Sequence, residues 1–356
     1  MSDDIRKGLI REAVFELLHY PKRSLGWHTK RVIKLCLGRG AEPLDKINWH
    51  TGLVANSLME YYKRNRNAED AGEVLTAVKK YFDRWIAGGC KLYYIDDTLC
   101  GLALIDLHQV TGDDKYKQAL DTMAQYLYHH ETDRAGSLPY RPAQGNGHIY
   151  ADGIGMMCPF LSKYGSVYGD RNAINLAVTQ IKNFITYGMD GKTGLPYHGY
   201  EQESQVKYGI IGWGRAVGFL MMGMIGCLTC LEKEHTSYEV IKQAFRRLVD
   251  KVESYQLNGG LYTWQLETRE GSVDTSATGM IIYAIAKGLQ EEILIGIHKS
   301  RMIRGKEGLW DAVKEGKIYG CLAECQGFGM YPQIYGAYPW SLGPALGVFV
   351  MLEETV

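Results

Sequence analysis

Two segments decide the fold of this chain: residues 213–231, WGRAVGFLMMGMIGCLTCL, and residues 237–255, SYEVIKQAFRRLVDKVESY. The first segment is apolar around its whole circumference and rich in small residues, which is typical of a helix buried on all sides. The second has an apolar stripe at helical spacing and a charged opposite face, which is typical of a helix that covers a core from outside. Together they predict one inner and one outer helix.

The same alternation recurs along the chain. Further all-apolar segments lie at 97–110, 153–164 and 275–289, further striped segments lie at 114–129 and 171–186, and other helical patterns lie at 293–300 and 341–353. A weak internal repeat relates Asp97 to Asp152, an offset of about 55 residues per helix pair. Six such pairs would occupy roughly 330 residues, nearly the whole chain. We therefore predict an all-α fold, an (α/α)6 barrel of six inner and six outer helices forming a single domain over 1–356. A helical solenoid with the same repeat is the alternative.

Composition and charge exclude several classes of protein. The chain has 40 Lys and Arg and 40 Asp and Glu, so it lacks the basic surplus of a nucleic-acid-binding protein. Its longest apolar run, 219–228, is too short to span a bilayer, and its first residues lack the pattern of a secretory signal. We expect a cytoplasmic monomer or homodimer that binds neither nucleic acid nor membranes.

The cysteines are more typical of reduced core thiols than of a metal site. Cys227 and Cys230 form a CxxC pair, but they lie within an apolar helical pattern. Cys321 and Cys325 form a second pair with different spacing. No phosphate-binding loop or dinucleotide-binding motif is present. We expect neither a metal ion nor a cofactor.

Four long loops precede predicted inner helices, at 131–152, 188–212, 256–274 and 315–340. In a barrel of this kind they would gather at one end, and long loops in compact domains are often functional. The 25 Tyr and 7 Trp provide flat rings with polar tips, which suit stacking on sugars as well as lining the rim of a large core.

Acidic residues stand where the loops enter the helices. Asp96-Asp97, Asp152 and Asp274 are three positions where a carboxylate could cap a helix N-terminus. Asp152 differs from the others because it precedes the apolar stretch GIGMMCPFL (153–161), where a carboxyl group loses hydration and retains its proton to higher pH. Asp152 and Asp97 are therefore the candidate general acid/base pair.

A second group of candidates is aromatic and basic. Trp213 and Arg215 lie in the sequence GWGRA (212–216), where the Arg fork suits a carboxylate and the Trp ring a sugar. A salt bridge that closes the barrel end is the alternative role for Arg215. The other candidates for substrate binding are His50, His148, Tyr150 and His198.

Several motifs occur together in one known family. They are Ile95-Asp96-Asp97, Ala151-Asp152-Gly153, Met156 to Leu161, His198-Gly199-Tyr200, Gly212 to Gly218, and Thr275-Ser276-Ala277. In order and over about residues 45–350, the chain resembles the unsaturated rhamnogalacturonyl hydrolases of glycoside hydrolase family 105, which are related to the unsaturated glucuronyl hydrolases of family 88. The segments DxxxMxxPFL and GWGRAxG are the most specific.

The resemblance implies an (α/α)6 barrel that acts on lyase products, oligosaccharides whose nonreducing galacturonyl or glucuronyl residue carries a C4=C5 double bond. The aspartate matching Asp152 would protonate C4 and help water add at C5, after which the hemiketal opens and the remaining sugar is released. Asp97 would be the second carboxylate, with His198, Trp213 and Arg215 in the substrate pocket. Phe219 and Tyr150 stand where many relatives have Trp, which bears on the preferred neighbouring sugar.

Two other functions are compatible with the same residues. A sugar isomerase or epimerase of this barrel class would need a histidine pair for proton transfer, for which His148 and His198 are available. The other alternative is a noncatalytic carbohydrate-binding barrel.

Overall fold

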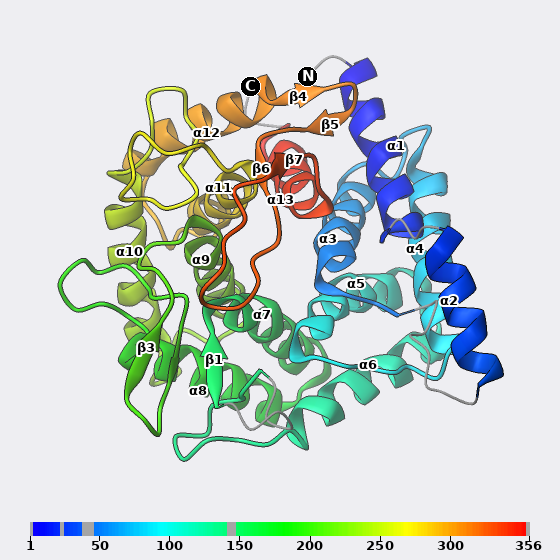
Figure 1. Ribbon diagram of the computed structural model, residues 1–356, viewed down its shortest axis with the longest axis horizontal. Coiled ribbons are helices and arrows are strands. Elements are labelled where there is room, and N and C mark those ends of the chain that lie inside the picture. The colour runs from blue at the N-terminus through cyan, green and yellow to red at the C-terminus, as the bar shows by residue number, and fades with distance from the viewer. Residues whose placement is uncertain (1–2, 22–24, 38–45, 141–146, 354–356) are drawn as a thin grey trace.

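The computed structural model describes residues 3–21, 25–37, 46–140 and 147–353, and most of its helices form two concentric rings (Figure 1). The inner ring consists of α3 (Trp49–Arg64), α5 (Gly101–Thr111), α7 (Ala151–Tyr168), α9 (Gly214–Leu228), α11 (Thr275–Gln290) and α13 (Pro339–Met351). The outer ring consists of α1 (Asp3–His19), α4 (Ala71–Ala87), α6 (Asp114–Tyr128), α8 (Arg171–Tyr187), α10 (Tyr238–Glu253) and α12 (Lys299–Asp311). A further helix, α2 (Leu25–Cys36), lies outside both rings.

The inner ring is closed. Helix α13 packs against both α11 and α3, so the last inner helix is a neighbour of the first. A solenoid would leave these two helices apart. The predicted (α/α)6 barrel is therefore confirmed, whereas the single-domain organisation over 1–356 stays a prediction. Among the described residues, none of the helices is both long and apolar enough to cross a membrane.

Small residues allow the inner helices to approach closely. All residues of α9 except Gly226 are buried. A Cβ atom at Gly155 of α7 would lie 2.6 Å from the Cα of Phe219 in α9. One at Gly218 of α9 would lie 2.6 Å from the Cβ of Met280 in α11. Separations this short exclude any side chain, which explains why the inner segments are rich in glycine.

The outer helices follow the predicted striped pattern, with one exception. The stripe of α10 is buried through residues such as Ile241, Phe245 and Leu248. The helix predicted at 293–300 is wrong, because the chain there forms a short 3-10 helix, η3 (Gly296–His298), and the outer helix α12 begins at Lys299. Helix α12 packs partly through Gly305 and Gly308, which give no apolar stripe in the sequence.

Short strands organise the loops at one end of the barrel. Strands β1 (His148–Tyr150), β2 (Gly199–Glu201) and β3 (Val206–Tyr208) form an antiparallel sheet in this order, with Ile149 opposite Tyr200. Strand β4 (Val313–Lys314) pairs with β5 (Lys317–Ile318), and β6 (Cys321–Leu322) pairs with β7 (Tyr335–Gly336). Residues 141–146 of the predicted loop 131–152 lie outside the described residues.

The segment 319–338, here called the strap, contains β6 and β7 and leads into α13. Figure 1 shows it extending from α13 across the mouth of the barrel towards β1. A 3-10 helix, η1 (Ile95–Cys100), precedes α5 at the same mouth. These segments, together with the β1–β3 sheet, surround the candidate site.

Candidate active site

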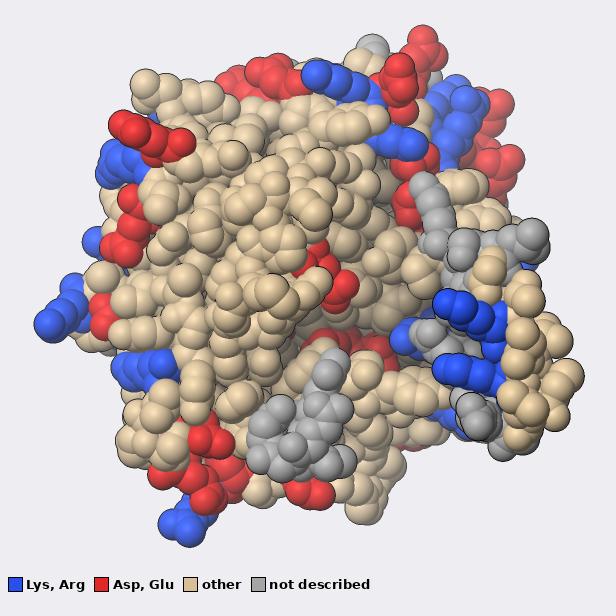
Figure 2. All heavy atoms as spheres, viewed as in Figure 1, with Lys and Arg blue, Asp and Glu red and all other residues tan. Residues whose placement is uncertain are grey.

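A cavity of about 200 Å³ lies where the N-terminal ends of the inner helices meet. It is lined by Trp49, Asp96, Tyr140, Tyr150, Asp152, Met156, His198, Trp213, Arg215, Glu324, Cys325 and Gly327. Figure 2 shows Asp and Glu atoms gathered near the hollowed centre of this face. The structure thus brings together the loops that precede the inner helices, as the sequence predicted.

Asp152 and His198 form the centre of a hydrogen-bonded chain. Asp152 lies in the first turn of α7, and its Oδ2 is 3.0 Å from Nε2 of His198, a side chain that is only 1% exposed. The other ring nitrogen of His198, Nδ1, is 2.8 Å from the hydroxyl of Tyr331 on the strap.

The hydrogen bonds of Tyr331 favour one position for the ring proton of His198. The backbone N–H of Ile210 donates to the Tyr331 oxygen over 3.4 Å, and the hydroxyl hydrogen of Tyr331 is available to be donated to Nδ1. Burial also raises the pKa of Tyr331 well above its usual range, so the hydroxyl keeps this hydrogen. With Tyr331 as the donor to Nδ1, a neutral His198 carries its proton on Nε2 and donates it to Oδ2 of Asp152.

The adjacent acids Asp96 and Asp97 have different surroundings. Asp97 accepts hydrogen bonds from the backbone N–H groups of Tyr93 (2.8 Å) and Tyr94 (3.1 Å) and so caps η1. Burial raises the pKa of Asp97 to about 6, although these hydrogen bonds oppose the change. Asp96, and not Asp97, lines the cavity with Asp152. The pair Asp152 and Asp97 expected from the sequence therefore stays a prediction, and Asp96 is a further carboxylate on the cavity wall.

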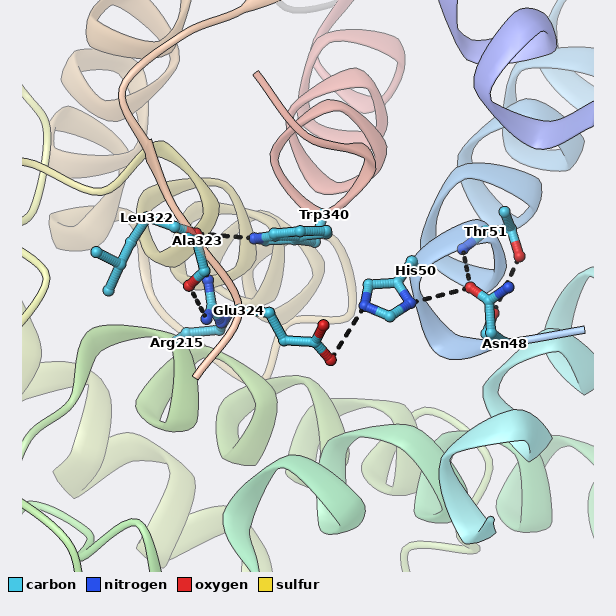
Figure 3. A network of polar contacts seen from close by, with 8 residues as sticks. All are labelled: Asn48, His50, Thr51, Arg215, Leu322, Ala323, Glu324 and Trp340. Atoms are coloured by element: carbon cyan, nitrogen blue, oxygen red, sulfur yellow. Dashed lines mark hydrogen bonds and ion pairs between the residues drawn. The ribbon is translucent and has the colours of Figure 1, made fainter. Parts of the chain in front are cut away.

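Arg215 donates hydrogen bonds to two carbonyls of the strap (Figure 3) and to the Ser276 hydroxyl of α11. Its NH1 donates to the Leu322 carbonyl and its NH2 to the Ala323 carbonyl, each over 2.9 Å. Its guanidinium carbon lies 4.7 Å from the centre of the Trp213 ring. Within the described part of the chain Arg215 forms no ion pair, so the alternative of a closing salt bridge is not met. The side chain of Arg215 lines the cavity, but NH1 and NH2 of its guanidinium group already donate hydrogen bonds to backbone carbonyls.

Glu324 was not among the candidates from the sequence, because this residue lies in a long loop with no periodic pattern. Its Oε1 is 3.3 Å from Nε2 of His50, whose Nδ1 is 3.0 Å from Oδ1 of Asn48 at the N-cap of α3 (Figure 3). Burial lowers the pKa of His50. Burial alone would raise the pKa of Glu324, but the contact with His50 and the charge of Arg215 hold it below its usual value. Glu324 is therefore an ionised carboxylate on the cavity wall.

Aromatic rings form another part of the wall. Phe328 of the strap stacks on Tyr150, with ring centres 4.2 Å apart, and on Tyr208, with ring centres 5.1 Å apart. His148 packs against Tyr208 and Phe328 and does not line the cavity.

The remaining sequence candidates lie in the interior. Phe219 is fully buried against Trp49, so it is not placed to contact a neighbouring sugar. Asp274 accepts a hydrogen bond from the Ser276 N–H and caps α11, which confirms its role as a helix cap. His50, like His148, does not line the cavity, but it contacts two lining residues, Glu324 and Trp49.

Paired carboxylates, an imidazole and aromatic walls at one mouth of a closed (α/α)6 ring are typical of a carbohydrate-cleaving enzyme. Comparison with known families agrees with this class. Residues 24–346 match the model of Glycosyl Hydrolase Family 88, and the chain belongs to this family. It is therefore a hydrolase of glycosidic bonds.

Several known proteins are similar to the chain. The unsaturated rhamnogalacturonyl hydrolase YesR of Bacillus subtilis (strain 168) is 24% identical over 243 residues, which cover 67% of this chain and 70% of that protein. A possible GH105 member from Klebsiella pneumoniae has the same fold, with a TM-score of 0.86 at 16% identity over 100% of this chain and 95% of that one. The unsaturated glucuronyl hydrolase of Bacillus sp. GL1 has a TM-score of 0.70 at 16% identity over 97% of this chain and 96% of that one.

Proposed function

We propose that the protein removes a Δ4,5-unsaturated galacturonyl or glucuronyl residue from the nonreducing end of a lyase-derived oligosaccharide. Membership of family 88 and the similarity to YesR support this substrate class. The observation that carries the proposal is the position of Asp152, on the cavity wall and hydrogen-bonded through Oδ2 to His198. We also propose that it acts in the cytoplasm as a monomer or homodimer.

Asp152 is the proposed proton donor. The C4=C5 bond of the substrate is an enol ether, so a proton added at C4 leaves positive charge shared by C5 and the ring oxygen. Because Oδ2 accepts the hydrogen bond from His198, the acidic proton of Asp152 belongs on Oδ1. A water molecule then adds at C5 and returns a proton to Asp152. The hemiketal at C5 opens, and the linkage to the next sugar breaks.

Asp96 and Glu324 are the proposed electrostatic partners in this reaction. Both line the same cavity as Asp152. Carboxylates held near developing positive charge stabilise a transition state, because they need little reorganisation as the charge forms. The aromatic wall around Tyr150 provides a face on which a sugar ring can stack.

An isomerase or epimerase is less well supported by the geometry. It would need His148 and His198 to face one substrate, but His148 packs outside the cavity lining and both ring nitrogens of His198 are already hydrogen-bonded. A noncatalytic barrel does not account for membership of a hydrolase family.

The direct test is incubation with unsaturated disaccharides from pectin and glycosaminoglycan lyase digests. We expect loss of the ultraviolet absorbance of the double bond together with release of the second sugar, and no cleavage of the matched saturated disaccharides. Cleavage of the saturated disaccharides would contradict hydration at C5. Absence of cleavage across all unsaturated substrates would contradict the proposed substrate class.

A further inference from the structure

A second cavity, of about 270 Å³, lies further along the inner helices than the active-site cavity. Residues from all six inner helices line it, including Asn56 of α3, Lys163 of α7 and Lys287 of α11. These residues lie well past the helix starts that surround Asp152, so the two cavities occupy opposite ends of the inner ring. The hydrolysis proposed above uses none of them.

Two lysines of this cavity share one carboxylate. Lys163 and Lys63 each place Nζ within 3.0 Å of the same oxygen of Asp106, at 2.8 and 2.9 Å. Asp106 lies on α5 and is 6% exposed. Burial lowers the pKa of Lys163; the charge of Asp106 opposes this shift, and the charge of Lys63 adds to it. A single carboxylate thus faces two ammonium groups, which leaves positive charge without a full counter-charge.

The other charged groups add to this surplus. Glu60 accepts a hydrogen bond from the hydroxyl of Tyr283 (3.2 Å) and lies 3.8 Å from NH2 of Arg64. Its charge is therefore already opposed by Arg64. Lys287 also lines the cavity, and within the described part of the chain its Nζ has no ion pair or hydrogen bond. The cavity and its immediate contacts therefore carry four cationic groups, Lys63, Lys163, Lys287 and Arg64, against three carboxylates, Asp106, Glu60 and the nearby Glu291.

A polar acceptor in the same wall is also unsatisfied. The side-chain oxygen of Asn56 is buried and has no hydrogen-bond partner among the residues that the structure describes. Leaving a buried acceptor unpaired is costly, so such an atom indicates a donor that the protein itself does not provide. A hydroxyl group next to an anionic group would satisfy both Asn56 and the excess lysine charge.

We propose that this cavity is a second binding site, for a monosaccharide-sized polyol that carries one carboxylate or phosphate group. The anionic group lies between Lys163 and Lys287, and a hydroxyl group donates to Asn56. A volume of about 270 Å³ is slightly below the range of roughly 300–1,000 Å³ for sites that hold drug-sized molecules, which suits a single sugar. The site does not depend on the reaction proposed above.

Two methionines allow ligand binding in each cavity to be followed separately by NMR. Met222 lines the second cavity, and Met156 lines the active-site cavity. In protein labelled with ¹³C at the methionine methyl groups, the two signals can be assigned with Met222→Leu and Met156→Leu. The probes are sodium galacturonate, inorganic phosphate and, as an uncharged control, galactose.

We expect galacturonate to shift the Met222 signal saturably and galactose to leave it unchanged. A response to phosphate as well would assign the recognised feature to the negative charge alone. Lys287→Gln, at a partly exposed position, should weaken the Met222 response at least tenfold. The matched variant Lys233→Gln, at an exposed position beyond α9, should not.

A Met222 signal that no anion moves would overturn the proposal, and the lysines would then only neutralise the C-terminal ends of the inner helices. An equal response in Lys287→Gln would also overturn it. Shifts of Met156 alone would report binding at the active site and count against a second site. Each outcome is independent of whether any unsaturated disaccharide is cleaved.

Discussion

At Arg215, both terminal nitrogens of the guanidinium donate hydrogen bonds to backbone carbonyls of the strap. The side chain is 1% exposed, so these bonds form away from competing water. Because Leu322 and Ala323 directly precede Glu324, Arg215 also determines where this carboxylate lies on the cavity wall. Arg215 thus contributes to both stability and the shape of the site.

Arg215→Lys tests this double role. Lysine keeps the charge but loses the planar fork that reaches two carbonyls at once. We expect the free energy of unfolding to fall by about 1.5–3 kcal/mol, the scale of a hydrogen bond to a charged group, and KM to rise. Chemical denaturation and steady-state kinetics would measure the two effects. An unchanged stability with a raised KM would instead indicate that Arg215 binds the substrate carboxylate directly.

Because of Asp97, we predict an unusual dependence of the free energy of unfolding on pH. The pKa of Asp97 is about 6 in the folded protein, above the ordinary value for Asp. Between about pH 4 and pH 6 the folded chain holds a proton that the unfolded chain has lost, so stability falls as the pH rises. Above pH 6 the carboxyl group is ionised in both the folded and the unfolded chain. The free energy of unfolding has then fallen by its full amount, about 3 kcal/mol.

Asp97→Asn should remove this loss, because an amide oxygen can still accept the hydrogen bonds from Tyr93 and Tyr94 without a buried charge. Urea denaturation at pH 4 and pH 7 would compare the variant with the native protein. We expect the variant to gain about 3 kcal/mol relative to the native protein between these pH values. A constant difference between the two proteins would show that Asp97 is not the group responsible.

Among the elements, the strap combines three kinds of contact with the site. It contributes Glu324, Phe328 and Tyr331 from one segment. A Cβ atom at Gly199 would lie 2.6 Å from the Phe328 ring, so the β1–β3 sheet leaves space for the strap at that point. The strap thus links the aromatic wall to the hydrogen-bonded chain that ends at Asp152.

Tyr331→Phe tests this link. The substitution keeps the ring, which packs against Trp213 and Trp264, but removes the hydroxyl that donates to His198. With Nδ1 free, His198 can also adopt the tautomer that lacks a proton on Nε2, and the hydrogen bond to Asp152 is then lost. We expect kcat to fall about 10- to 100-fold, with a changed pH profile and little change in KM.

The histidine tautomer itself can be observed by ¹⁵N NMR of the free protein. We expect the Nε2–H form of His198 in the native chain and a mixture in Tyr331→Phe. The matched control is Tyr335→Phe in the same strap, whose hydroxyl bonds to Gln333 and not to His198. Equal effects of both substitutions would mean that Tyr331 acts only through the packing of the strap.

For the whole molecule, stability depends on closing the inner ring between α13 and α3. A Cβ atom at Gly343 of α13 would lie 2.6 Å from the carbonyl carbon of Leu53 in α3. Gly343→Ala should therefore lower the free energy of unfolding by about 1–3 kcal/mol, the usual cost of overpacking.

The matched control for ring closure is Gly72→Ala on the outer helix α4. A Cβ atom there would meet nothing within 4 Å, so the substitution should stabilise the protein by about 0.4–1 kcal/mol. Thermal and chemical denaturation of both variants would check the contrast. Equal effects at the two positions would show that the close approach of α13 and α3 does not limit stability.

The barrel could be predicted from the sequence because inner and outer helices differ in local pattern, as 213–231 and 237–255 do. The site could be predicted only in part. Asp96 and Asp97 are adjacent, and only the turn of η1 determines which of them faces the cavity. Glu324 and Tyr331 were missed because the path of the strap depends on distant partners, among them Arg215 and His198.

The central claim is that Asp152 delivers the proton to C4, and the turnover of Asp152→Asn on an unsaturated disaccharide tests it most directly. Asparagine preserves the size of the side chain and can accept the hydrogen bond from His198, but it cannot donate a proton to carbon. We predict that kcat, followed by loss of the double-bond absorbance, falls about 10²- to 10⁴-fold at unchanged melting temperature, while Asp97→Asn stays near the native rate. Near-native turnover by Asp152→Asn would contradict the account.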